Sequence, residues 1–127
     1  MFRFAHSNFY VADLDRSLAF YREALDLTEA CRMDTGDSLV VYLKDKADSH
    51  FMLELIWLKD GTRPESTSEL HLAFSSEDMP GAKARHAAMN CICYEDDFLG
   101  LYFIMDPDGY WLCIMPEESP LQKPPAN

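Results

Sequence analysis

The chain has 127 residues, 48% of them hydrophobic, and a formal net charge of −11. This length predicts one domain, or two small halves that share a core. The acidic balance argues against nucleic acid as a partner, because phosphate binding needs clustered Lys and Arg. No apolar run approaches the roughly 18 residues of a membrane span, and the first ten residues lack a secretory signal. The four cysteines form no CxxC pair, so we expect reduced thiols and a cytoplasmic protein.

The first half of the chain predicts one helix among four strands. Strands are expected at residues 4–11, 28–33, 39–43 and 51–58, and a helix at about 15–25. The helix is indicated by the spacing of Leu14, Leu18, Tyr21 and Leu25. Asp13 or Asp15 is a suitable N-cap. The segment 59–69 contains Gly61 and Pro64 and is the predicted linker.

The same order of elements returns after the linker. Strands are expected at residues 70–75, 91–94, 101–105 and 110–115, and a helix at 80–90 that starts with Pro80. Asp106-Pro107-Asp108-Gly109 predicts a tight turn between the last two strands, in which Asp106 hydrogen-bonds back onto the backbone. Residues 118–127 contain three prolines and are the predicted tail.

The two halves are related by a repeat. His71 follows His6 by 65 positions, and the same offset carries Asp13 onto Asp78. A helix follows the first strand in both halves, and three strands follow each helix. We therefore predict an α+β fold in which one domain, residues 1–127, consists of two βαβββ modules at about 4–58 and 70–116.

Four side chains at repeat-related positions are candidate metal ligands: His6, Glu54, His71 and Cys113. Imidazole, carboxylate and thiolate groups are the usual ligands of divalent transition metals. Each of these residues alone is more often a packing or surface residue. Glu54, however, stands among Leu, Met and Ile, where an unpaired carboxylate is costly. Taken together, the four residues predict a metal site.

The chain resembles the vicinal oxygen chelate superfamily. This superfamily includes glyoxalase I (lactoylglutathione lyase), fosfomycin-resistance proteins, extradiol dioxygenases and bleomycin-resistance proteins. The resemblance extends from about Phe4 to Pro116, and its carriers are His6, VADLDRSLAFYREALDL at Val11–Leu27, Glu54 in FMLELIW, His71 in LHLAF and DPDGY at Asp106–Tyr110.

The resemblance implies a fold and a ligand set. The two modules are expected to form a curved mixed sheet with the helices on its convex face and a metal site on its concave face. His6 and His71 match the two histidines of the superfamily, and Glu54 matches the first-half carboxylate of glyoxalase I. Cys113 stands where the superfamily usually has a second-half Glu, and is a candidate fourth ligand.

The pattern is closest to glyoxalase I, which implies a metal-dependent lyase or isomerase. In such an enzyme the metal binds two vicinal oxygens and stabilises an enediolate, and Glu54 is the available base for proton transfer. Zinc or nickel is the expected ion. Tyr10 and Leu58 stand where bacterial glyoxalases often have an Arg and an Asn that contact glutathione, so the substrate is left open. The superfamily also implies a homodimer.

A second interpretation is a small-molecule-binding protein of bleomycin-resistance type, which needs no metal. Under either interpretation, the candidate contacts to a small molecule are the aromatic residues Tyr10, Trp57, Tyr102 and Trp111. Aromatic strand residues are more often part of the core. The acidic charge would favour a cationic ligand in the binding-protein interpretation. Metal content discriminates between the two.

Overall fold

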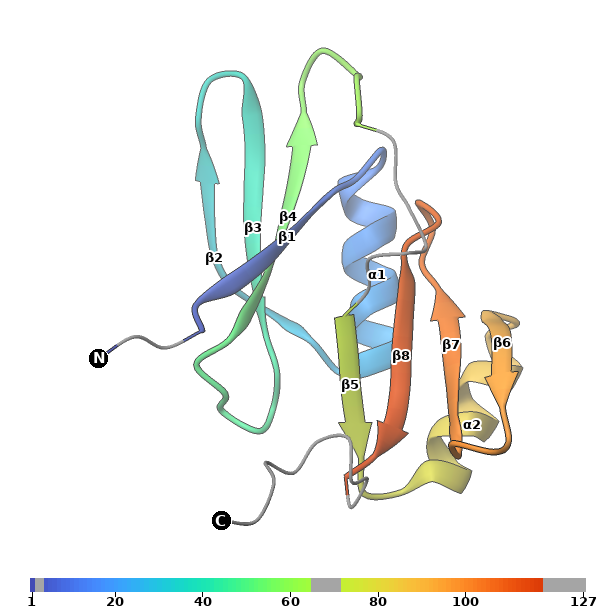
Figure 1. Ribbon diagram of the computed structural model, residues 1–127. Coiled ribbons are helices and arrows are strands. Elements are labelled where there is room, and N and C mark those ends of the chain that lie inside the picture. Colours follow the sequence, from blue (N-terminus) through green and yellow to red (C-terminus); the bar gives the residue numbers. More distant parts are fainter. Residues whose placement is uncertain (2–3, 65–71, 118–127) are drawn as a thin grey trace. The chain divides into compact units, whose positions relative to one another are not determined.

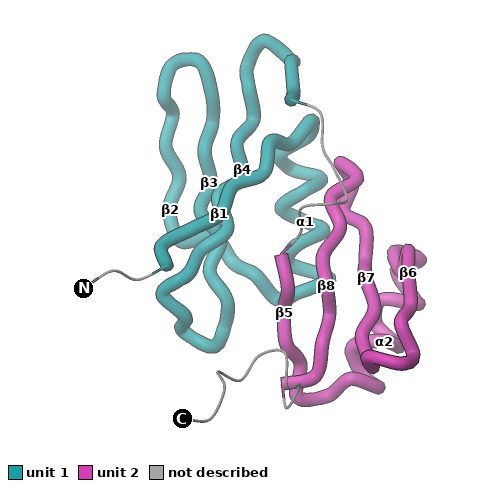
Figure 2. Tube along the Cα trace, viewed as in Figure 1, with its two compact units in different colours: residues 1–65 teal, residues 66–127 magenta. Residues whose placement is uncertain are grey.

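The computed structural model describes residues 1, 4–64 and 72–117 of the chain (Figure 1). The chain divides into two compact units, unit 1 at residues 1–65 and unit 2 at residues 66–127 (Figure 2). Within these described residues, each unit has one helix and a four-stranded mixed sheet. The predicted pair of βαβββ modules is therefore confirmed. No helix within the described ranges is long and apolar enough to cross a membrane.

Unit 1 follows the predicted order of elements. These are β1 (His6–Tyr10), α1 (Leu14–Leu25), β2 (Thr28–Asp34), β3 (Ser38–Lys44) and β4 (Met52–Leu58). The sheet has the order β1-β4-β3-β2. β1 runs parallel to β4, and the other neighbouring strands are antiparallel.

Helix α1 begins where the sequence predicts but packs through a different stripe. Its N-cap is Asp13, whose carboxylate accepts a hydrogen bond from the Arg16 backbone N–H at 3.1 Å. The buried positions of α1 are Leu14, Ser17, Tyr21 and Ala24. Leu18 and Leu25 of the expected stripe are only half-buried. The buried stripe thus includes two small residues, which allow a helix to approach its neighbour closely.

The sheet of unit 1 has two chemically different faces. Val41, Leu43, Leu53 and Leu55 alternate onto one face and are all buried; α1 contacts β4, the strand that carries two of them. The face opposite, which carries Glu54, is called here the Glu54 face. Strand alternation thus separates Glu54 from the leucines that flank it in sequence.

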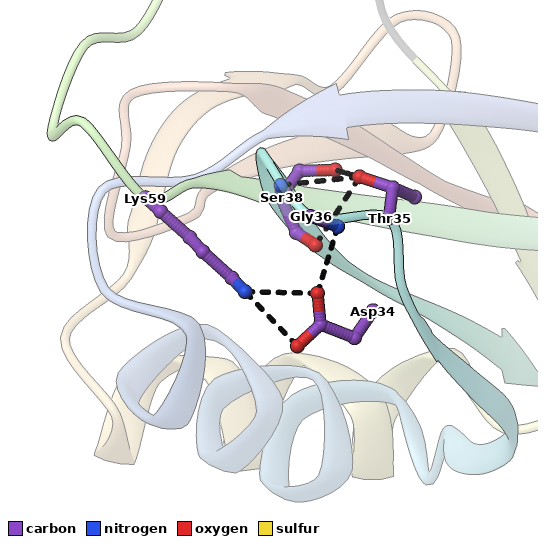
Figure 3. A network of polar contacts seen from close by, with 5 residues as sticks. All are labelled: Asp34, Thr35, Gly36, Ser38 and Lys59. Atoms are coloured by element: carbon purple, nitrogen blue, oxygen red, sulfur yellow. Dashed lines mark hydrogen bonds and ion pairs between the residues drawn. The ribbon is translucent and has the colours of Figure 1, made fainter.

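A network of polar contacts fixes the β2–β3 turn (Figure 3). Thr35 and Ser38 exchange hydrogen bonds, with the Thr35 N–H donating to the Ser38 carbonyl at 3.0 Å. The Asp34 carboxylate accepts from the Gly36 N–H at 2.9 Å and from the Lys59 ammonium at 2.8 Å. Lys59 directly follows β4, so these bonds help to hold β2, β3 and β4 in one register.

Unit 2 repeats the plan of unit 1. Its elements are β5 (Leu72–Ser76), α2 (Met79–Ala88), β6 (Ile92–Asp96), β7 (Leu101–Met105) and β8 (Trp111–Pro116). The sheet order is β5-β8-β7-β6, with β5 parallel to β8. Asp78 caps α2, and Pro80 lies in its first turn as predicted. The helix ends two residues earlier than expected, because Asn90 adopts a left-handed φ of 56°.

The turn between β7 and β8 confirms the prediction for Asp106. Oδ1 of Asp106 accepts hydrogen bonds from the backbone N–H groups of Asp108 at 2.9 Å and Tyr110 at 2.8 Å. Gly109 has a φ of 90°, which favours glycine. Asp106 is only 4% exposed, so water cannot easily replace the carboxylate oxygen. This side chain therefore fixes the register of Trp111 and Cys113 on β8.

We expect Asp106→Ala to lower the free energy of unfolding by about 2–4 kcal/mol, because it leaves two buried N–H donors unsatisfied. Asp106→Asn is the matched control, since its Oδ1 can accept both bonds, and it should retain most of the stability. Urea denaturation of the two variants measures the difference. Equal stability of Asp106→Ala and wild type would contradict this role.

Candidate functional site

His6, Tyr42 and Glu54 meet on the Glu54 face of unit 1. Nε2 of His6 lies 3.5 Å from Oε2 of Glu54. The rings of His6 and Tyr42 meet edge to face, with centroids 5.5 Å apart. A side-chain hydrogen bond to Glu54 raises the pKa of the Tyr42 hydroxyl, and desolvation adds to this shift. The carboxylate thus has an imidazole and a phenol as partners.

Three adjacent strands bring these side chains together. In the antiparallel pair β3–β4, Tyr42 lies directly opposite Glu54. In the parallel pair β1–β4, Asn8 lies opposite Glu54, and His6 lies opposite Met52. Residues paired in this way project from the same face of a sheet. The β-strand register is therefore the direct cause of the cluster.

The surroundings of Glu54 differ from those that its sequence neighbours suggest. Its side chain is 13% exposed, while that of His6 is 44% exposed. Leu53 and Leu55 are buried on the opposite face, so they do not surround the carboxylate. The expectation that Glu54 needs a donor or a cation agrees with its contacts to Tyr42 and His6. An imidazole nitrogen beside a carboxylate oxygen is a donor set that suits a divalent metal.

The other two predicted ligands belong to the second half of the chain. His71 lies outside the described residues. Cys113 lies on β8 opposite Ala73 of β5 and Phe103 of β7, and is 4% exposed. Burial raises the pKa of its thiol, which favours the neutral form. Within residues 1, 4–64 and 72–117, no three His, Cys, Asp or Glu side chains group closely enough to hold a metal ion.

Two of the four predicted aromatic contacts share a sheet face with a candidate ligand. Tyr10 alternates onto the Glu54 face, opposite Ile56. Trp111 shares a face with Cys113. The Trp111 ring packs 5.6 Å from that of Phe103, and lies 6.4 Å from that of Tyr94 at an interplanar angle of 22°. Tyr94 is 51% exposed, so this aromatic cluster reaches the surface.

The other two aromatic residues point from the opposite faces of their sheets. Trp57 shares the face of Leu55 and is half-buried. Tyr102 is 2% exposed, and its hydroxyl lies 2.8 Å from Nδ1 of His86 on α2. Burial raises the pKa of Tyr102 to about 12. The Tyr102–His86 contact joins β7 to α2 inside unit 2.

The contact between Tyr42 and Glu54 was not predicted from the sequence. Tyr42 lies within the predicted strand at residues 39–43, and no local signal pairs it with Glu54. Its pairing depends on how the connection at 45–51 sets the register of β3 against β4. The residues of the β2–β3 turn specify the register of β2 against β3, but their sequence alone does not specify how β4 pairs with β3.

Comparison with known proteins places this architecture in a family. Residues 3–114 match the family model of the Glyoxalase/Bleomycin resistance protein/Dioxygenase superfamily. The chain belongs to this superfamily. The match spans both units and includes all the candidate ligands. A comparison with curated protein sequences gave no significant match.

Solved structures of the superfamily fold carry different functions. The trypanothione-dependent glyoxalase I of Leishmania major is 28% identical, with a TM-score of 0.82, over 96% of this chain and 91% of that chain. FosX, a fosfomycin resistance protein from Mesorhizobium loti, is 15% identical, with a TM-score of 0.70 over 90% of both chains. TnmS3, an antibiotic-binding protein from Streptomyces sp. CB03234, is 16% identical, with a TM-score of 0.70, over 92% of this chain and 98% of that chain. The two likenesses below 25% identity concern the fold alone.

Proposed function

We propose that the chain is a metal-dependent lyase or isomerase of the glyoxalase I type. The observation that carries this proposal is the pairing of His6 and Glu54, with Nε2 and Oε2 3.5 Å apart on one sheet face. Superfamily membership and the likeness to the Leishmania enzyme support it. The reaction is a proton transfer between adjacent carbons beside a carbonyl group, which isomerises the substrate without a co-reactant.

The donor set fits a divalent metal, with zinc or nickel as the proposed ion. His6 and Glu54 would supply two ligands from unit 1. His71 would supply the third ligand, and Cys113 is the candidate fourth. When bound, such an ion supplies Lewis-acid polarisation of a substrate carbonyl oxygen.

Glu54 is the proposed base. Its carboxylate takes a proton from the carbon beside the carbonyl and returns it to the neighbouring carbon. At 13% exposure the carboxylate is largely shielded from water, which limits loss of the proton to solvent. Tyr10, on the Glu54 face, is a proposed substrate contact, and Trp111 is proposed as another. Trp57 and Tyr102, from the opposite faces of their sheets, are less direct candidates.

A second function, small-molecule binding without catalysis, is favoured by one observation. In the cluster of Tyr94, Phe103 and Trp111, the rings of Tyr94 and Trp111 are stacked and Phe103 packs against both, and the cluster reaches the surface of unit 2. Such rings bind planar or cationic groups of a ligand, and the net charge of −11 suits a cation. This function would not require His6, Glu54 or His71.

We also infer a homodimer that acts in the cytoplasm, as the cysteine pattern and the superfamily resemblance imply. Two large apolar side chains that are exposed in the single chain support its association with a second copy. Phe4 is 87% exposed and Phe98 is 95% exposed. Light scattering of the purified chain at micromolar concentration tests the dimer, and a monomer would count against it.

The test of the proposed enzyme uses the purified chain loaded separately with nickel or zinc. The substrates are hemithioacetals of methylglyoxal with glutathione and with trypanothione, and with smaller thiols. We expect metal-dependent isomerisation of at least one hemithioacetal. Absence of turnover with every thiol, together with tight binding of a planar cationic ligand, would favour the binding protein instead.

A further inference from the structure

The Glu54 face holds a side chain that the proposed reaction does not yet use. Tyr42 lies directly opposite Glu54 across the antiparallel pair β3–β4, and its ring packs edge to face against the imidazole of His6. It is therefore adjacent to both members of the pair on which the proposed function rests.

We infer that Tyr42 is a positioning residue that holds Glu54 and His6 in the geometry needed to bind a metal. This inference rests on the proposed function and extends it to a residue outside the candidate ligand set. Tyr42 is no metal ligand in this role, and it acts through the two residues that it contacts.

The backbone supports this role. Tyr42 and Glu54 are directly paired across two antiparallel strands, where opposed side chains on one face lie about 5 Å apart at Cβ. Both neighbours of Tyr42, Val41 and Leu43, are buried on the opposite face. The strand cannot slip by one residue without exposing these two side chains and burying Tyr42 among them.

The turn network supports the same register from the end of the hairpin. The ammonium of Lys59, which directly follows β4, donates to the Asp34 carboxylate (Figure 3). The backbone N–H of Lys59 donates to the Asp37 carbonyl. These contacts anchor β4 to the β2–β3 turn. The register that pairs Tyr42 with Glu54 is therefore fixed by contacts at the end of the hairpin as well as by the strands themselves.

The two contacts of Tyr42 have separate effects. The hydroxyl, carried by the residue directly opposite Glu54, is proposed to restrict rotation of the carboxylate, whose side chain otherwise has three rotatable bonds. The ring of Tyr42 restricts the orientation of the His6 imidazole through their edge-to-face contact. The His6 side chain is otherwise 44% exposed and has room to rotate. Partners of this kind, one step removed from a metal, typically change metal affinity by about 10–100-fold.

The hydroxyl and the ring can be separated by substitution. Tyr42→Phe removes the hydroxyl and keeps the ring against His6, whereas Tyr42→Leu removes both. Thr62→Val is the control, because it removes a hydroxyl that donates to an exposed carboxylate, that of Asp60, elsewhere in unit 1. Thermal unfolding of each variant shows whether the chain remains folded.

The experiment measures the affinity for Co²⁺ alone, by competition with a chromophoric chelator. We expect Tyr42→Phe to weaken Co²⁺ binding by about 10-fold and Tyr42→Leu by up to about 100-fold, with Thr62→Val unchanged. Where an active substrate has been found, Tyr42→Phe should also lower kcat with little change in KM, because the base is less well oriented.

Glu54→Gln distinguishes failure of this inference from failure of the proposed function. If Glu54→Gln weakens Co²⁺ binding and both Tyr42 variants bind as the wild type does, Tyr42 is no positioning residue and the proposed metal site stands. If the wild type does not bind Co²⁺, the proposed function fails and the role of Tyr42 fails with it.

Discussion

Glu54→Gln should lower kcat for isomerisation of an active hemithioacetal by about 10²–10⁴-fold, the usual contribution of a positioned general base. Glutamine has nearly the same shape as glutamate, and its carbonyl oxygen can still accept a hydrogen bond from a neighbouring donor. It cannot accept a proton at neutral pH, and it is a weaker metal ligand than a carboxylate. The substitution therefore removes the chemistry of Glu54 while keeping most of its packing.

The matched control is Glu29→Gln, which makes the same substitution elsewhere in unit 1. Glu29 lies on β2 and is paired with Arg32 at 2.7 Å, and this partner lowers the pKa of its carboxyl. Both side chains are exposed, so breaking the pair should have little effect on folding. Activity should be unchanged in Glu29→Gln. Full activity in Glu54→Gln, with metal still bound, would show that another group is the base.

Cys113→Glu should create or raise isomerase activity in the presence of nickel or cobalt. The superfamily resemblance places a second-half carboxylate at this position, and a glutamate would restore it. A carboxylate there gives a second oxygen ligand in place of a thiol whose pKa is raised by burial. Cys113→Gln is the control, because it has the same size and no charge, and it should not gain activity.

The metal-free Cys113→Glu protein should show a characteristic pH dependence of stability. At a position that is 4% exposed, desolvation raises the pKa of the new carboxyl above its unfolded value of about 4.3. A group whose pKa is higher in the folded than in the unfolded state contributes to stability at low pH. That contribution is lost as the pH rises from the unfolded pKa through the folded pKa. The free energy of unfolding should therefore fall above about pH 4 without metal.

Added nickel should reverse this loss, by about 2.7 kcal/mol at 100 times the dissociation constant. Wild type and Cys113→Gln should respond less to nickel. If nickel stabilises all three proteins equally, or none of them, Cys113 does not stand at the metal site.

Local signals in the sequence were sufficient to predict most of the fold. The Asp13 and Asp78 caps, Pro80 and the Asp106 turn act within a few residues of themselves, so their effects can be predicted without tertiary contacts. The repeat then extended these elements to two modules. The packing stripe of α1 was less predictable, because small residues such as Ser17 and Ala24 are selected by the distance to the sheet.

The candidate site was predicted only in part, for reasons of register. His6 and Glu54 were identified, and they lie close together in unit 1. The apolar neighbours of Glu54 in sequence suggested a carboxylate surrounded by hydrocarbon, but strand alternation places Leu53 and Leu55 on the other face. Tyr42, the residue directly opposite Glu54, comes from β3. Its position depends on a pairing between strands, and residue spacing along one strand does not reveal that pairing.

The most direct test of the central claim is the metal content of the purified chain. The protein is loaded with nickel or zinc, excess metal is removed, and the bound ion is measured by mass spectrometry for wild type, His6→Ala, His71→Ala and Cys113→Glu. The account predicts one divalent ion per wild-type chain, a clear loss in both histidine variants, and retention in Cys113→Glu. The account would be contradicted if the wild type bound no metal and neither His71→Ala nor Cys113→Glu altered metal or ligand affinity. The interpretation as a binding protein would then replace the metal-dependent enzyme.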